Sequence, residues 1–126
     1  MTEKDALEIA KPTVKAFVDC IADGLFEQIL DHADFAEGIS QESLVNAIEG
    51  FKNDARISHI DKYGASSQFT VNKSRLNAYA YNDGSEFSVD YDFTTDGGVN
   101  DLTLQMRFVL CESGLFKAII EDCHVL

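Results

Sequence analysis

The chain has 126 residues and carries 22 acidic against 10 basic side chains, a net charge of −12 at neutral pH. A hydrophobic content of 45% excludes a disordered chain and suffices for the core of one globular domain, expected to span residues 1–126. Negative charge on this scale repels nucleic acid and anionic membranes, and it attracts cationic partners.

Helices are expected in the first half of the chain. Apolar residues recur at helical spacing from Asp5 to Asp23, and Pro12 is expected to mark the start of the regular part. Gly24 is expected to end this helix, and a short second helix is expected over Leu25–His32. A third helix is expected over Gln41–Lys52, because the preceding serine is suited to capping a helix N-terminus.

The middle of the chain gives a weaker pattern. Ala55–Ile60 is compatible with a short strand, and Gln68–Asn72 is expected to form another. The residues between them, Asp61–Ser67, are expected to form a loop.

From Leu76 onward the sequence predicts an antiparallel meander of four strands. Apolar and polar residues alternate over 87–93 and over 102–110, the period of strands with one face against a core. Turns that contain glycine separate the successive strands. The expected fold is therefore α+β, with three N-terminal helices packed on one face of a curved antiparallel sheet. That sheet comprises the meander and one or two short strands.

The last turn, Glu112-Ser113-Gly114, predicts the register of the final hairpin. Three-residue hairpin loops usually place glycine third, where the chain turns left-handed. Continuing this ladder toward the C-terminus places Asp122 opposite Leu104 and His124 opposite Leu102. Two ionisable side chains are therefore expected on the apolar face of the sheet.

The other hairpins decide which polar residues lie on the outer face. Matching the apolar faces of the middle hairpin places Asp90 beside Gln105 on that face. The first hairpin has two candidate registers. A two-residue Asp83-Gly84 turn directs Tyr79 and Tyr81 outward, and a loop longer by one residue directs them inward. We favour the first register, because Asp-Gly is a strong signal for a two-residue turn.

This order of elements resembles the nuclear transport factor 2-like superfamily. Phe17–Phe26, leading to Ile29–Asp34, is similar to the helix-Gly-helix opening of those domains. The tail from Gly97 to Leu126 is similar to that of an uncharacterised group of small bacterial domains. The resemblance implies a curved sheet that wraps a long helix into a cone. It leaves function open, because the superfamily includes isomerases, dehydratases, immunity proteins and binding modules without catalysis.

Asp122 and His124 are the catalytic candidates. Residues i and i+2 on one strand face lie ~7 Å apart, close enough to flank a bound molecule. Superfamily isomerases and dehydratases resemble this in using an acid or a histidine that lines the cone. The facing positions are apolar apart from Tyr91, which argues against catalysis. Asp31-His32-Ala33-Asp34 is interpreted as a solvated helix end, so neither a metal nor a cofactor is expected.

The outer face of the sheet is the candidate for partner binding. Tyrosine anchors interfaces well and charge speeds encounter, so acids interleaved with tyrosines resemble a protein-recognition surface. The candidate residues are Tyr79, Tyr81, Glu86, Asp90, Asp92 and Gln105. The alternative is an ordinary solvated face. An open face of this kind also commonly mediates homodimers.

These features favour a non-enzymatic module that binds a basic protein partner. The specific prediction is a bacterial immunity protein that neutralises a nuclease-type toxin, since nucleases need Lys and Arg to hold phosphate. The alternative is an isomerase- or dehydratase-like enzyme, or a ligand-binding protein, that uses the cone interior near Asp122 and His124. Neither nucleic acid nor a membrane is an expected partner.

The cysteines and the N-terminus bear on location. In the predicted register Cys123 lies opposite Thr103, far beyond disulfide reach of Cys111, so free buried thiols are expected. The first ten residues are rich in charge, and no apolar run approaches the ~20 residues of a membrane span. A cytoplasmic location is therefore expected.

Overall fold

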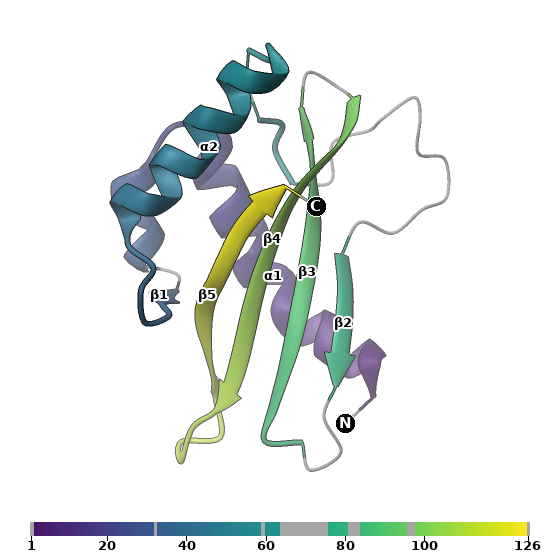
Figure 1. Ribbon diagram of the computed structural model, residues 1–126. Helices are drawn as coiled ribbons and strands as arrows, with labels where there is room; N and C mark the ends of the chain where they lie inside the picture. Colours follow the sequence, from purple (N-terminus) through teal and green to yellow (C-terminus); the bar gives the residue numbers. More distant parts are fainter. Residues whose placement is uncertain are drawn as a thin grey trace.

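The computed structural model describes residues 2–31, 33–58, 60–63, 76–80, 84–95 and 98–125. These residues form an α+β structure with helices against a five-stranded sheet (Figure 1). In chain order the elements are α1 (Glu3–Ala22), the 3-10 helix η1 (Phe26–Asp31), β1 (Asp34–Phe35), α2 (Gln41–Ala55), β2 (Leu76–Ala80), β3 (Glu86–Thr95), β4 (Gly98–Leu110) and β5 (Phe116–Val125). The predicted α+β class is confirmed.

The prediction of three helices is wrong, because the described part of the chain has two α-helices. Gly24 ends the first of them in the left-handed region (φ 73°), as expected. The next segment is a six-residue 3-10 helix, the form typical of short connectors. The start of α1 also differs from the prediction. Thr2 and Asp5 form a capping box, so the helix begins at Glu3 and Pro12 lies inside it.

Both α-helices pack against the sheet through narrow apolar stripes. α1 lies behind the sheet, and α2 lies beside β5 (Figure 1). The buried side chains of α1 include Ala6, Ala10, Val14, Phe17 and Ile21, whereas those of α2 are Leu44 and Ile48. Ser40 caps α2 as predicted. Among the elements that the structure describes, no helix covers the opposite, outer face of the sheet (Figure 1).

The strand order is β1-β5-β4-β3-β2, and the last four strands form the predicted antiparallel meander. The sheet is nevertheless mixed, because β1 runs parallel to β5. The short strand considered at Ala55–Ile60 does not form over residues 55–58, position 59 lies outside the described residues, and Ile60 makes only an isolated β-bridge. α2 continues through Ala55 instead, and Arg56 then turns left-handed (φ 56°). The strand expected at Gln68–Asn72 lies outside the described residues.

The first two hairpins have the preferred registers. Tyr79 pairs with Ser88 and is 51% exposed on the outer face, as the two-residue turn predicts. Leu76 and Ala78 are buried on the inner face. Asp90 pairs with Gln105, so the register of the middle hairpin is confirmed at this point. Tyr81 lies outside the described residues.

The last hairpin departs from prediction at a β-bulge. Near the turn the register is regular, and Ile120 pairs with Met106. The register then shifts by one residue, so Asp122 pairs with Gln105 and His124 with Thr103. The predicted placement of Asp122 and His124 on the apolar face is therefore wrong. A bulge disturbs the ladder locally, whereas burial of an ionised carboxylate costs several kcal/mol.

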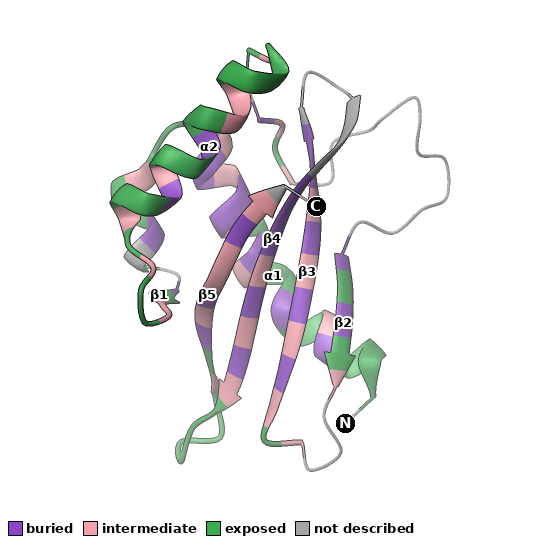
Figure 2. Ribbon diagram, viewed as in Figure 1, coloured by how far each residue is buried: buried purple, intermediate pink, exposed green. Residues whose placement is uncertain are grey.

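Aromatic side chains fill the space between the sheet and the helices. Tyr91 is 2% exposed, and its ring stacks on Tyr63 with centroids 5.1 Å apart. Phe93 meets Tyr91 edge-on at 5.4 Å, and further along the sheet Phe87 stacks on Phe108 at 4.9 Å. Buried and partly exposed residues alternate along the strands (Figure 2). Among the described residues, no helix is both long and apolar enough to cross a membrane.

Candidate functional site

The bulge in β5 brings the two sets of candidate residues onto one surface. Asp122 and His124 now point to the outer face, next to Gln105 and Thr103 of β4. Their side chains are 50% and 32% exposed. The inward position between them is taken by Cys123, which pairs with Leu104. We call the surface formed by Tyr79, Glu86, Asp90, Asp92, Gln105, Asp122 and His124 the acidic face.

Two rows of polar residues cross the centre of the acidic face. In one row Asp90, Gln105 and Asp122 lie on three adjacent strands. In the other, Asp92 accepts a hydrogen bond of 3.1 Å from the Thr103 hydroxyl, and His124 is the next partner of Thr103 across the sheet. Asp90 and Asp92 of β3 and Asp122 of β5 therefore lie on the same part of the outer face.

The environment of Asp90 shows how crowded these carboxylates are. Burial, followed by the negative charge of Asp92, raises the pKa of Asp90. Hydrogen bonding by Gln105 and Tyr79 and the nearby His124 offset part of this rise. Burial and the charge of Asp90 likewise raise the pKa of the Tyr79 phenol. A cation brought to this surface would relieve the repulsion.

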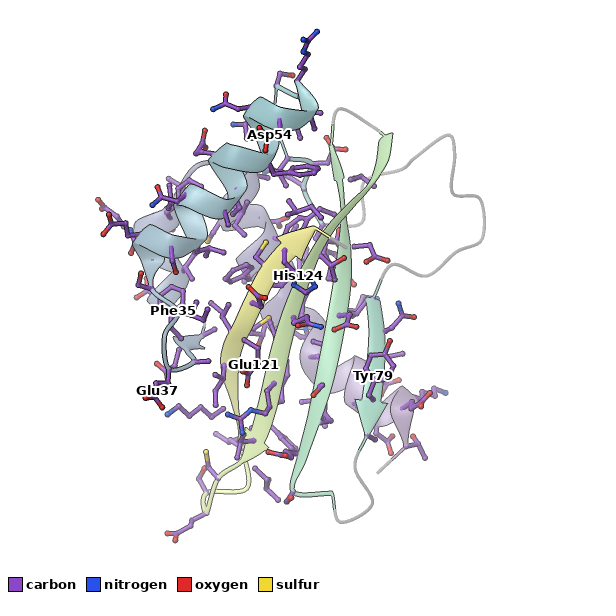
Figure 3. All side chains as sticks on the ribbon, viewed as in Figure 1. Phe35, Glu37, Asp54, Tyr79, Glu121 and His124 are labelled. Atoms are coloured by element: carbon purple, nitrogen blue, oxygen red, sulfur yellow. The ribbon has the colours of Figure 1, made fainter. Side chains whose placement is uncertain are left out.

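His124 contributes a further unsatisfied group. Its Nδ1 lies 3.2 Å from Asp122 Oδ2. The geometry does not make a hydrogen bond, however, and this buried nitrogen has no hydrogen-bond partner in the described structure. Figure 3 shows His124 near the C-terminal end of β5. The pair therefore lies on the outer face of the sheet and not on its apolar face.

At the lower part of the face, Arg107 is compensated by two acids. Its Nε lies 2.6 Å from Glu121 Oε1, and its Nη1 lies 3.3 Å from Glu86 Oε2. Hydrogen bonds to Glu121 and then to Glu86 raise the pKa of this guanidinium. Glu86 thus lies on the predicted surface, but its charge is already paired with Arg107. The free negative charge of the face lies around Asp90, Asp92 and Asp122.

The described core of the structure is mainly apolar. Tyr91 is 2% exposed, and its ring contacts the rings of Tyr63 and Phe93. Burial, and then the charge of Asp122, raises the pKa of the Cys123 thiol to about 12, which keeps it neutral and a poor nucleophile. No group of three or more His, Cys, Asp or Glu residues in the described ranges could hold a metal ion.

The cysteine predictions are confirmed in part. All three thiols are free, as expected, and Cys20 and Cys123 are buried. Cys111 is exposed, contrary to prediction, because it lies at the turn between β4 and β5. Cys123 pairs with Leu104 and not with Thr103, another consequence of the bulge.

Sequence reasoning placed Tyr79, Asp90, Asp92 and Gln105 on the outer face correctly, and it missed Asp122 and His124 there. One signal could have found them. Ile119-Ile120 followed by Glu121-Asp122 interrupts the alternation of apolar and polar residues in this strand, and a β-bulge, with its one extra residue, restores it.

Comparison with known proteins gives a family but no activity. A family model described as a domain of unknown function (DUF7668) matches residues 18–126. No curated protein matches the chain, and no solved structure matches it.

Proposed function

The chain belongs to the DUF7668 family, a domain of unknown function, and from this starting point we propose that it is a non-enzymatic module whose acidic face binds a basic protein. One observation carries the proposal. The bulge in β5 adds Asp122 to the same surface as Asp90 and Asp92, and the pKa of Asp90 is raised by burial and by its charged neighbour. A cationic partner would remove that electrostatic penalty.

The acidic face also has an anchor for a protein partner. Tyr79 is 51% exposed next to Asp90, so it presents an apolar ring with a polar end. Such residues contribute strongly to binding energy, while surrounding charges accelerate encounter. A homodimer through this face is disfavoured by the same charges, because a two-fold axis places a patch against its own copy.

The specific form of the proposal is an immunity protein that neutralises a nuclease-type toxin. A nuclease needs a basic surface to hold phosphate, and a net charge of −12 is complementary to it. The three free thiols support action in a reducing compartment such as the cytoplasm. The long helix that lies against an antiparallel meander supports the resemblance to the nuclear transport factor 2-like superfamily.

The alternative, an enzyme using the interior near Asp122 and His124, loses the geometry that motivated it. Asp122 pairs with Gln105 and His124 with Thr103, so neither side chain lies on the apolar face of the sheet, and Tyr91 stacks on another aromatic ring. His124 still lines a groove beside α2, but Asp122 does not. We therefore propose only the binding module.

The test first reads the genes adjacent to the one that encodes this protein. A basic nuclease domain found there is purified, and its binding to this protein is measured by calorimetry at low and at physiological salt. We expect the affinity to fall steeply with salt, and the double variant Asp90→Asn/Asp92→Asn to bind at least about tenfold more weakly. The control Glu37→Gln/Glu112→Gln removes the same charge from exposed positions outside the face. An affinity that does not change with salt concentration, or that falls equally in both double variants, would contradict the proposal.

A further inference from the structure

A groove of about 640 Å³ separates α2 from the ends of β4 and β5. Ala47, Gly50, Phe51 and Asp54 line it on the helix side, and Leu102 and Cys123 line it on the sheet side. We call it the α2–β5 groove. Figure 3 shows Asp54 near the C-terminal end of α2 and His124 near the C-terminal end of β5. The volume falls in the range of pockets that hold a ligand or a large side chain.

Small residues of α2 keep this groove open. Gly50 lies inside the helix, where glycine costs about 1 kcal/mol relative to alanine. No close contact requires it, because a Cβ at Gly50 would meet nothing within 4 Å and its φ is not in the left-handed region. Ala47, one turn earlier, is also exposed toward the groove. Glycine at position 50 therefore lowers the stability of α2 and leaves the groove beside it open.

The charge of the lining selects the kind of occupant. Asp54 supplies a carboxylate, and none of the described residues that line the groove is Lys or Arg. The remaining wall is mainly apolar, through Phe51 and Leu102. An apolar group next to a cation is complementary to this combination, whereas an anionic ligand is not.

The groove is continuous with the acidic face. His124 lines the groove and also pairs with Thr103 beside Asp92. A basic protein held on the acidic face would therefore reach the groove without leaving the surface. Charge alone gives fast but short-lived encounters, and a buried apolar anchor is what slows dissociation.

We propose that the α2–β5 groove receives an aromatic or large aliphatic side chain of the basic partner, flanked by a Lys or Arg that pairs with Asp54. This inference rests on the proposed function and names the second part of the same recognition surface.

The test compares two probe peptides at low salt, Ac-Arg-Arg-Trp-Arg-Arg-amide and Ac-Arg-Arg-Ser-Arg-Arg-amide, by amide-resolved NMR titration. We expect the Trp peptide to bind about fivefold or more tightly and to shift the amide signals of Gly50, Phe51 and Cys123. Gly50→Leu adds a side chain at a lining position where a Cβ meets nothing within 4 Å. This variant should lower the affinity for the Trp peptide to that for the Ser peptide. Asn53→Leu adds the same side chain at an exposed α2 position outside the groove lining. This control variant should change the affinity for neither peptide.

The outcomes separate the two proposals. If both peptides bind equally and shift only residues of the acidic face, the groove inference is overturned and the proposed function stands. If Gly50→Leu leaves the preference for the Trp peptide intact, the inference is likewise overturned. If neither peptide binds, and Asp90→Asn/Asp92→Asn has no effect on the nuclease domain either, both proposals fail together.

Discussion

Asp19 illustrates how one side chain ties distant parts of this chain together. Its Oδ1 accepts a hydrogen bond of 2.9 Å from the backbone N–H of Tyr63, and its Oδ2 lies 2.7 Å from Lys15 Nζ. Burial acts to raise the pKa of Asp19, but the hydrogen bonds from Lys15 and Tyr63 outweigh it, so the pKa is lowered. Because the Tyr63 ring stacks on Tyr91, this carboxylate also fixes part of the core.

We expect Asp19→Asn to lower the free energy of unfolding by about 1 kcal/mol at neutral pH, because charged hydrogen bonds are lost. A carboxylate with a lowered folded pKa stabilises the fold above its unfolded pKa, and this contribution disappears as pH falls through the folded value. The difference between variant and parent should therefore shrink below the ordinary value of 3.8. Urea denaturation across pH measures it, with exposed Glu8→Gln as control. A difference that grows in acid would contradict this account.

At the scale of elements, the bulge in β5 decides what the sheet presents on each side. Ile120 pairs with Met106 and Asp122 with Gln105, so Glu121 is the extra residue of the bulge. The extra residue turns Asp122 outward and lets Cys123 complete the core, where it is 6% exposed. The Asp122 side chain also accepts a hydrogen bond of 2.8 Å from the Cys123 backbone N–H, which stabilises the bulged chain.

Deletion experiments test this assignment. Deleting Glu121 should leave a regular ladder with Cys123 still buried, at a cost of about 1–2 kcal/mol from the lost contact with Arg107. Deleting Lys117 instead should turn Ala118 and Ile120 outward and cost more than about 3 kcal/mol. Denaturation and the rate of thiol labelling at Cys123 distinguish the two. Equal losses, or rapid labelling of Cys123 after removal of Glu121, would show that the bulge does not set the register.

At the scale of the molecule, the net charge of −12 acts on stability and on binding with opposite signs. Like charges repel within the folded chain. At Asp90, burial raises the pKa and the neighbouring charge of Asp92 raises it further. Because its folded pKa is raised, Asp90 weakens the fold as pH rises through that value. The same field attracts a basic partner from solution.

Sodium chloride should therefore stabilise the free protein while it weakens partner binding. We expect the melting temperature to rise between about 20 and 200 mM salt, because screening becomes effective over about 10 Å near 0.1 M. Asp90→Asn/Asp92→Asn should melt higher at low salt and respond less to added salt. Calorimetry measures both, with Glu37→Gln/Glu112→Gln as the matched charge control. A melting temperature that falls with salt would contradict a net repulsive field.

Local patterns were sufficient for much of the fold. The alternation around Asp90 and the Asp-Gly turn predicted the outward position of Tyr79, because strand register follows from turn length and from one buried face. Ser40 likewise predicted the start of α2, since capping depends on atoms a few residues apart. These effects act over a few residues, so the sequence alone was sufficient to predict them.

Composition and order alone thus determined the acidic character, the α+β class and the central part of the outer face. The side to which Asp122 and His124 point was decided only by the tertiary structure. A β-bulge is chosen by the energy of the whole core, here by burying Cys123 in place of a carboxylate. The α2–β5 groove has the same origin, because its walls come from segments far apart in the chain and meet only when the helix packs beside β5.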